Sequence, residues 1–190
     1  DSMKIEKFLK LISNWILTII IKPTSTILVL DSKNLINVLT FFKFFFNYSH
    51  PSLMDVWGND FPYLKNRFEL NYHILNYNKA NRMFIKIFVD EYTSVDSLSY
   101  IYQSANWLER EVWDMYGVFF KNHKDLRRIL TDYGFIGFPL RKDFPLSGYT
   151  EVRYTEKKKQ VLLEPLEILQ EYKFFNFVNS WENKDVKYIQ

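Results

Sequence analysis

The sequence contains no cysteine, and this absence narrows what the chain can do. Disulfide bonds, a thiol nucleophile, and cysteine-ligated zinc or iron–sulfur clusters are excluded within this chain. The net charge of +3 is too small to indicate nucleic acid or an anionic membrane as a partner by itself.

Glycine and alanine are also scarce. There are 5 glycines, and alanine occurs only at Ala80 and Ala105, whereas there are 18 phenylalanines and 13 tyrosines. Alanine is the best helix former, so a chain with helices has no structural reason to avoid it. The abundant residue types are encoded by A/T-rich codons and the scarce ones by G/C-rich codons. We therefore interpret the bias as that of an A/T-rich genome, such as many organelles have; an aromatic-rich fold is the alternative.

Few side chains are suited to catalysis or metal binding. None of the three histidines, His50, His73 and His123, has a companion at metal-ligand spacing. Glu109 and Glu111 point about 160–200° apart on a helix, so they cannot act together as an acid and base pair. Neither a glycine-rich phosphate loop nor a G-x-S-x-G motif is present. The sequence therefore predicts no catalytic, cofactor-binding or metal-binding residues.

The part of the chain before the first clear strand pair predicts helices and one strand. Apolar residues at helical spacing predict a helix over residues 4–21, whose apolar part is about half the length needed to span a bilayer. Residues Thr26–Leu30 read as a strand, and Ser32 can cap a second helix. The segment from His50 to Pro62 is expected to be a loop. The buried stripe of the second helix consists of Leu35, Ile36, Leu39, Phe42 and Phe46.

The clearest strand pair follows. Apolar and polar residues alternate over Phe68–Ile74 and again over Met83–Val89, which is typical of two half-buried strands joined by a turn. A further helix is expected after them, capped by Ser94 or Ser97 and ended by Gly117.

The rest of the chain is organised around the stretch Ala105–Tyr149. Its first half is an amphipathic helix in which Arg110 and Asp114, at i,i+4, are expected to pair. In its second half glycines and prolines alternate with aromatic residues, and a structureless loop of about twenty residues usually serves binding. Aromatic burial alone is too weak to order so long a segment, so we predict that Thr131–Tyr149 is ordered mainly by another protein.

The C-terminal part predicts short elements only. Residues Tyr149–Tyr154 and Gln160–Leu163 read as a hairpin, and Pro165 opens a short helix to Tyr172. The fold class is therefore α+β, a single domain with a mixed or antiparallel sheet packed by helices. The expected boundaries are 1–130 for this domain and 131–190 for an extended docking segment.

Two other functions remain open on the residues alone. Basic and aromatic residues around Arg128 and Arg141 would suit single-stranded nucleic acid, but Asp125, Asp132 and Asp143 would repel its phosphates. A stand-alone acid–base enzyme would have to use a carboxylate of the predicted helix.

The order of residues in this stretch resembles a known family. The run Glu109-Arg110-Glu111, Asp114, Met115-Tyr116, His123, Arg127, Ile129-Leu130 resembles the signature of the 30-kilodalton subunit of respiratory complex I, NADH:ubiquinone oxidoreductase. The strings LRRILTDYGF and RKDFPLSGY continue the match at the spacing of that family. The similarity runs from about Asn66 to about Glu182.

The resemblance implies a non-catalytic, hydrophilic subunit of the peripheral arm, near the quinone end, supporting NADH to ubiquinone electron transfer coupled to proton translocation. It implies a C-terminal segment that wraps the 49-kilodalton subunit, beside a cluster-bearing subunit of 20 kilodaltons. FMN, iron–sulfur clusters and quinone would be held by partner subunits, on the matrix side of the mitochondrial inner membrane. RKDFPLSGY followed by EVRY resembles the mitochondrial and proteobacterial branch, and with the codon bias this predicts mitochondrial encoding.

A set of charged and aromatic residues in the matched stretch is expected to bind partner subunits, because arginine and aromatic residues are enriched at interface hot spots. Ile136 and Phe138 stand where the family usually has polar residues, and are expected to meet a partner or an apolar patch. The expected partner-binding residues are Glu109, Arg110, Glu111, Asp114, Arg127, Arg128, Asp132, Phe138, Arg141, Lys142, Asp143 and Phe144.

Overall fold

The computed structural model describes residues 13–22, 25–45, 51–77, 80–170 and 172–173. The chain divides into two compact units, Asp1–Leu146 and Ser147–Gln190, and each is described here by itself. The division falls at Leu146, so residues 131–146, expected to belong to a docking segment, group with the α+β domain.

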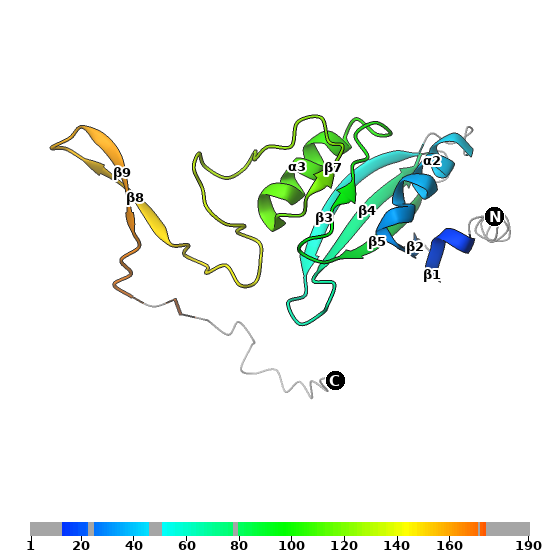
Figure 1. Ribbon diagram of the computed structural model, residues 1–190, viewed down its shortest axis with the longest axis horizontal. Coiled ribbons are helices and arrows are strands. Elements are labelled where there is room, and N and C mark those ends of the chain that lie inside the picture. The colour runs from blue at the N-terminus through cyan, green and yellow to red at the C-terminus, as the bar shows by residue number, and fades with distance from the viewer. Residues whose placement is uncertain (1–12, 23–24, 46–50, 78–79, 171, 174–190) are drawn as a thin grey trace. The chain divides into compact units, whose positions relative to one another are not determined.

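The first unit is a mixed sheet with two α-helices in its described residues (Figure 1). Its strands lie in the order β1-β2-β5-β4-β3; β2 and β5 are parallel, and the other neighbours are antiparallel. This arrangement confirms the predicted α+β class. The elements are η1 (Ser13–Trp15), β1 (Ile16–Ile21), β2 (Ser25–Leu30), η2 (Ser32–Asn34), α2 (Leu35–Phe45), β3 (Ser52–Asp60), β4 (Phe68–Asn76), β5 (Asn81–Val89), β6 (Val95–Asp96), α3 (Ala105–Tyr116) and β7 (Phe120–Lys121).

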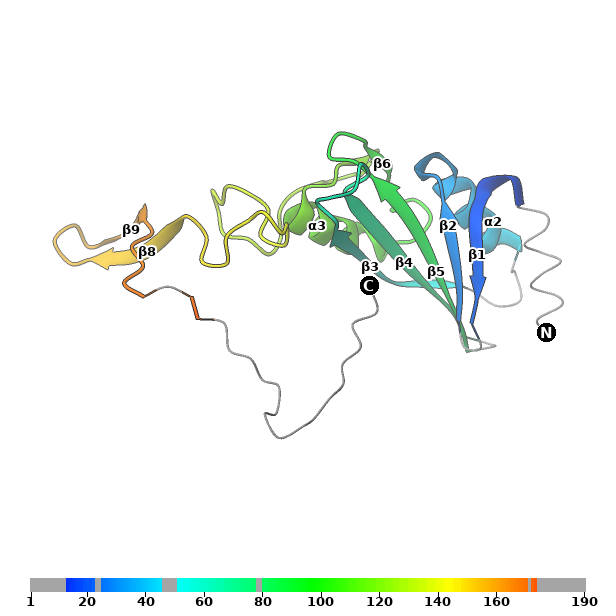
Figure 2. The ribbon, with the colours of Figure 1, turned by 90° about the horizontal axis from the view of Figure 1, so that it is seen from below.

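The core lies between the sheet and the helices α2 and α3, which cover the same face of it (Figure 2). Leu39 of α2 and Val112 of α3 belong to one buried cluster with Leu70 of β4 and Ile87 of β5. The predicted stripe of α2 is confirmed at its buried leucines and at Phe42, while Phe46 lies outside the described residues.

The β4–β5 hairpin confirms the predicted strand pair. One face of β4 enters the core as expected, but the other face is buried as well. The carboxylate of Glu69 lies on that second face. It accepts side-chain hydrogen bonds of 2.9–3.2 Å from Asn59, Asn71 and Lys86. Because β4 has a strand on each side, polar side chains of its neighbours cover it.

The prediction of a helix over residues 4–21 is wrong for residues 16–21, whereas Ser13–Trp15 forms the short 3-10 helix η1. Ile16–Ile21 forms the strand β1, which pairs with β2; residues 4–12 lie outside the described residues. This stretch consists mainly of isoleucine and threonine, whose β-branched side chains favour a strand. The same residues satisfy a helical spacing by chance, so periodicity alone gives the wrong answer.

Strand β3 overturns the expected loop over residues 50–62. The pairing register shifts between Leu53 and Asp55, which marks a bulge. A bulge breaks the two-residue alternation, so the strand pattern is hidden in the sequence. Further along, a Cβ on Gly58 would lie 2.9 Å from the ring of Tyr116, so this glycine allows α3 to pack closely on β3.

Helix α3 begins later than expected. Its N-cap residue is Ser104 rather than Ser94 or Ser97. The Ser104 hydroxyl donates to the carbonyl of Leu53 at 3.0 Å. Gly117 ends the helix in a left-handed conformation with φ of 77°, as predicted.

The second unit contains the hairpin β8 (Thr150–Thr155) and β9 (Gln160–Pro165), which confirms the predicted hairpin. The predicted helix after it is wrong, because residues 166–170 are not helical. Instead the N–H of Leu166 donates to the carbonyl of Tyr149 at 3.0 Å and continues the ladder. One face of the hairpin is apolar and exposed, and it consists of Val152, Tyr154, Val161 and Leu163.

Candidate functional site

Helix α3 turns two of its acidic side chains inward. Glu109 and Asp114 are 0% exposed, whereas Glu111 is exposed; Glu109 and Glu111 point to different sides of the helix, as expected from residues two apart. The pair expected between Arg110 and Asp114 does not form. The Nε of Arg110 donates instead to the carbonyl of Arg127 at 3.2 Å, because Asp114 is fully occupied by other donors.

The carboxylate of Asp114 holds the segment that follows β7. Its Oδ2 accepts the backbone N–H groups of Ile129, Leu130 and Thr131 at 3.2, 2.7 and 2.9 Å. Its Oδ1 accepts the Thr131 hydroxyl at 2.6 Å and lies 3.3 Å from Nη1 of Arg128. Burial by itself would raise the pKa of Asp114, but the hydrogen bonds from Thr131 and the other amides outweigh it and lower the pKa.

Arg128 organises the next turn of the chain from within. Its Nη1 donates to the carbonyl of Gly137 at 2.8 Å. Its guanidinium also lies over the rings of Phe135 and Phe138, at 5.8 and 5.0 Å from their centroids. The irregular segment that begins at Thr131 therefore folds around the charged side chain of Arg128, which lies just before it.

A second cluster fixes the far end of the segment. Arg67, just before β4, forms a two-pronged bond to Asp60 at 2.7 and 2.9 Å, an ion pair with Asp143 at 3.1 Å, and an ion pair with Glu91. Asp60 also accepts the N–H of Lys142 at 2.8 Å. Burial by itself would raise the pKa of Asp60, but the hydrogen bonds from Arg67 and Lys142 outweigh it and lower the pKa.

Arg141 joins this cluster to helix α3. Its Nε donates to the carbonyl of Tyr116 at 2.6 Å, and its Nη1 lies 3.6 Å from Glu91. The guanidinium sits between two rings, 5.0 Å from the centroid of Phe68 and 4.6 Å from that of Phe138. The stretch Arg141–Pro145 is thus attached to its own domain by the charged side chains of Arg141 and Asp143.

The structure divides the expected partner-binding residues by exposure. Three of them, Glu109, Arg110 and Asp114, use their polar atoms inside the domain, so their side chains offer nothing to a partner in this conformation. Glu111, Arg127, Asp132, Lys142 and Asp143 are exposed. Arg128, Phe138, Arg141 and Phe144 are half-buried. Glu109, Arg110 and Asp114 are buried.

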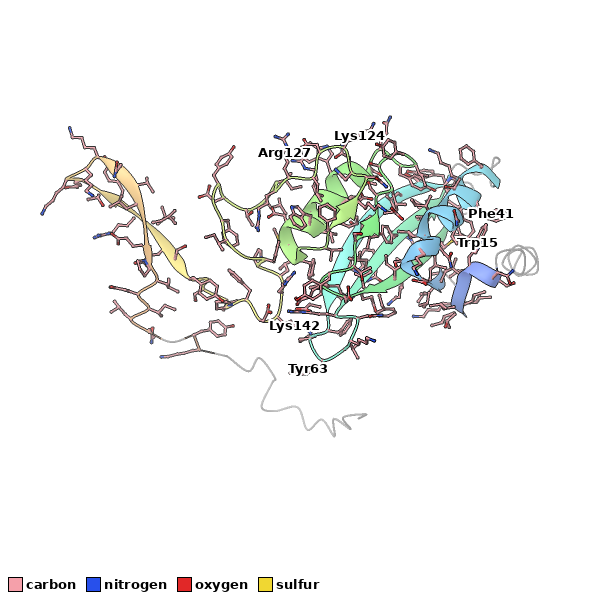
Figure 3. The ribbon with its side chains drawn as sticks, viewed as in Figure 1. Trp15, Phe41, Tyr63, Lys124, Arg127 and Lys142 are labelled. Carbon is pink, nitrogen blue, oxygen red and sulfur yellow. The ribbon has the colours of Figure 1, made fainter. Side chains whose placement is uncertain are left out.

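Three exposed basic side chains lie on two stretches of the surface. Arg127 and Lys124 lie at the outer edge of the segment after β7, and Lys142 lies near the β3–β4 loop that carries Tyr63 (Figure 3). The Lys142 ammonium is 5.6 Å from the ring centroid of Phe61 in that loop. The Lys124 ammonium is 5.3 Å from the ring centroid of Tyr100, and Arg127 pairs with Asp125 at 3.0 Å, so each of these three basic side chains has an aromatic or acidic neighbour.

Sequence reasoning singles out Ile136 but misses Arg67 and the row of exposed apolar side chains to which Ile136 belongs. Arg67 carries no pattern of its own, since a single charge before a strand is common. The row could be recognised only once its neighbours were known to be buried. The ring of Phe138 packs on that of Trp113, with centroids 5.8 Å apart, whereas Ile136 is 88% exposed. The exposed apolar residues of the segment are Leu130, Tyr133, Ile136, Leu140 and Leu146.

Two further findings concern the described part of the chain. It contains no group of three histidine, aspartate or glutamate side chains placed to hold a metal ion. None of its helices is long and apolar enough to cross a membrane.

Comparison with known proteins agrees with the resemblance in the sequence. The profile of the family described as respiratory-chain NADH dehydrogenase, 30 Kd subunit, matches residues 28–150. The chain is 48% identical to NADH-ubiquinone oxidoreductase subunit 9 of Reclinomonas americana, over 90% of this chain and 79% of that protein. It is 52% identical to NADH dehydrogenase (ubiquinone) iron-sulfur protein 3 of Solanum tuberosum, over 70% of each.

Two further comparisons extend the likeness to other respiratory complexes. A component of the NADH-quinone oxidoreductase of Paramagnetospirillum magneticum is 46% identical, over 82% of this chain and 78% of that protein. A chain in the structure of the membrane-bound sulfane sulfur reductase, an archaeal respiratory membrane complex, aligns with a TM-score of 0.66 over 90% of this chain and 99% of its own length. Its identity is 22%, so this likeness concerns the fold alone.

The fold and the site define an α+β domain that carries an internally anchored loop with exposed apolar side chains. The chain belongs to the 30-kilodalton subunit family of the respiratory-chain NADH dehydrogenase, and it is a peripheral-arm subunit of complex I. The complex to which it belongs is an NADH:quinone oxidoreductase.

Proposed function

We propose that the chain is a structural subunit of mitochondrial complex I that binds the 49-kilodalton subunit through the segment between Arg127 and Leu146. In this proposal the 49-kilodalton subunit and the neighbouring 20-kilodalton, cluster-bearing subunit form the quinone pocket. FMN, iron–sulfur clusters and quinone are held by partner subunits, and this chain takes no chemical part. It lies on the matrix side of the inner membrane and is encoded in the mitochondrion.

One observation carries the docking proposal: the segment is anchored from inside, yet its apolar side chains point outward. Asp114 and Arg67 bind it at its two ends, while Tyr133 is 99% exposed and Ile136 is almost as exposed. Clustered exposed apolar residues mark interaction sites. A loop that is already held in shape loses little conformational entropy on binding, which favours association.

The expected partner-binding residues take two roles in this proposal. The exposed ones, including Glu111 and Asp132, bind partner subunits directly. The buried Glu109 and Asp114 act indirectly, because they hold the chain segments that carry the contact residues. Arg128 and Arg141 belong mainly to the second group, since their donors are used within the domain.

The hairpin of the second unit supports a second docking element. An isolated two-stranded hairpin is marginally stable in water. Its apolar face, which includes Tyr154 and Leu163, is exposed within this chain. We propose that this face is covered by a partner protein of the complex, as the expected wrapping of the C-terminal segment implies.

The test is replacement of the chain in mitochondria by variants, scored by native electrophoresis of complex I and by capture of the 49-kilodalton subunit. Tyr133→Ser combined with Ile136→Asn should reduce the assembled complex. Tyr92→Ser is the matched control, because Tyr92 is also almost fully exposed, at 93%, but lies outside the segment. Equal assembly of the double variant and the control would contradict the proposed docking surface.

A further inference from the structure

A buried carboxyl group of the first unit has no permanently charged partner among the described residues. Glu109 is 0% exposed. Its Oε1 accepts the backbone N–H of Leu98 at 2.7 Å, and its Oε2 lies 2.6 Å from Oγ of Ser97. An unpaired charge is costly in such a place, so a buried carboxyl group tends to keep its proton.

The neighbouring hydroxyls accommodate either protonation state. Ser97 Oγ lies 2.9 Å from Ser99 Oγ and accepts the Ser99 N–H at 3.1 Å. A hydroxyl has one hydrogen to donate and two lone pairs to accept with. When Glu109 is ionised, Ser99 donates to Ser97 and Ser97 donates to the carboxylate. When Glu109 is protonated, its O–H donates to Ser97 and Ser97 donates to Ser99. Ser97 uses its hydrogen and both lone pairs in each case.

The imidazole of His123 does not supply the missing positive charge. The backbone N–H of Asp125 donates to its Nδ1 at 3.1 Å, so that nitrogen carries no hydrogen. The ring hydrogen is therefore on Nε2, which lies 3.2 Å from the carbonyl of Asn106 and 3.7 Å from Oε2 of Glu109. A charged imidazole would set an N–H of its own against the amide of Asp125.

The other titratable groups around Glu109 are also uncharged or directed away. From β4 it is faced by the phenol of Tyr72, whose pKa is raised by burial and by the nearby Glu109. Arg110, the next residue on α3, is directed to the carbonyl of Arg127 and to the ring of Trp107. Burial accordingly raises the pKa of Glu109 to about 7, although the bonds from Ser97 and Leu98 act to lower it.

We propose that Glu109 is a buried proton-binding site, which exchanges its proton with solvent through the hydroxyl groups of Ser97 and Ser99. Exposure increases along this path, from 0% at Glu109 to 4% at Ser97 and 9% at Ser99. On release, the Glu109 proton passes to Ser97 Oγ, Ser97 passes its own proton to Ser99 Oγ, and Ser99 gives its proton to water. The carboxylate and one hydronium ion are the products. The site is tested on the chain by itself, so its failure is distinguishable from a failure of the proposed docking to the 49-kilodalton subunit.

Infrared spectroscopy of the full chain over a pH titration tests the site. We expect a C=O band of a protonated carboxylic acid that disappears with a midpoint near the raised pKa. The band should be lost in Glu109→Gln and kept in Glu111→Gln, which changes an exposed glutamate of the same helix. A spectrum whose carboxyl bands all titrate in the range of exposed glutamates, about 4.3, would overturn the proposal.

Hydrogen–deuterium exchange of the same band tests the path. After transfer to D2O, Ser99→Ala should lose the fast phase of exchange, whereas Ser99→Thr, which keeps the hydroxyl, and Ser94→Ala, at an exposed serine, should retain it. Retention of the fast phase in Ser99→Ala would overturn the serine path. If Ser99→Ala does not fold, slow exchange in folded Ser99→Thr would also contradict it.

Discussion

Asp114 binds Thr131 twice: its Oδ2 accepts the Thr131 N–H at 2.9 Å and its Oδ1 accepts the Thr131 hydroxyl at 2.6 Å. Asp114 belongs to helix α3, whereas Thr131 opens the irregular segment. A single buried side chain therefore sets where that segment starts. The expectation that another protein mainly orders Thr131–Tyr149 has to accommodate these internal bonds, and a partner is needed less for shape than for covering apolar side chains.

Replacing Asp114 by asparagine should destabilise the domain. The amide keeps one acceptor oxygen but sets an NH2 group against backbone N–H donors, so several bonds to a charged acceptor are lost. We expect the free energy of unfolding to fall by about 2–3 kcal/mol in urea denaturation of the full chain. The amides of Ile129–Thr131 should also exchange hydrogen faster. Glu111→Gln on the same helix should change the stability by less than about 0.5 kcal/mol, and an equal effect of both variants would be inconsistent with the anchoring role.

Replacing Arg67 by methionine should cost about 3–5 kcal/mol, because it leaves the buried carboxylate of Asp60 without its partner. Arg67→Lys should be intermediate, since lysine keeps the charge but lacks the two-pronged donor. Combining Arg67→Met with Asp60→Asn should cost less than the sum of the single changes. Strictly additive losses in chemical denaturation would show that the two side chains are not coupled.

Gly117→Ala should be more harmful than Gly134→Ala. Both glycines have positive φ, 77° and 74°, so each alanine pays roughly 1 kcal/mol of backbone strain. A Cβ on Gly117 would also lie 2.6 Å from the Phe138 ring, whereas one on Gly134 would meet nothing within 4 Å. We expect a further loss of about 1–3 kcal/mol at Gly117 from this overlap. Equal melting temperatures of the two variants would contradict the close packing of Phe138.

The stability of the chain should depend on pH through Glu109. Its folded pKa of about 7 is raised above the unfolded value of 4.5, so its contribution is fully present below pH 4.5 and is lost as the pH rises through 7. This loss is on the order of 3 kcal/mol. Glu109→Gln cannot ionise, so its stability relative to the original chain should rise over the same interval and then stay level. A difference that is constant with pH would rule out a buried proton on Glu109.

Local patterns predicted some elements well and hid others for identifiable reasons. The alternation over β4 and β5 and the glycine after α3 are strong local signals. Strand β1 is masked because its isoleucines also satisfy a helical spacing, and β3 is masked by the bulge after Leu53. Pairs such as Arg67 with Asp143 could not be predicted, because the two residues are far apart in the sequence and no local pattern links them.

By itself the sequence determined the α+β class, the central hairpin, the end of α3 and the family, because each rests on local order or on a long string of residues. Only the tertiary structure decided which polar side chains face inward. Helical spacing places Glu109 and Glu111 on opposite sides but does not say which side is buried. That choice depends on donors outside the helix, Leu98 for Glu109 and Thr131 for Asp114. A carboxyl group can leave water only where such donors, or a retained proton, replace its hydration.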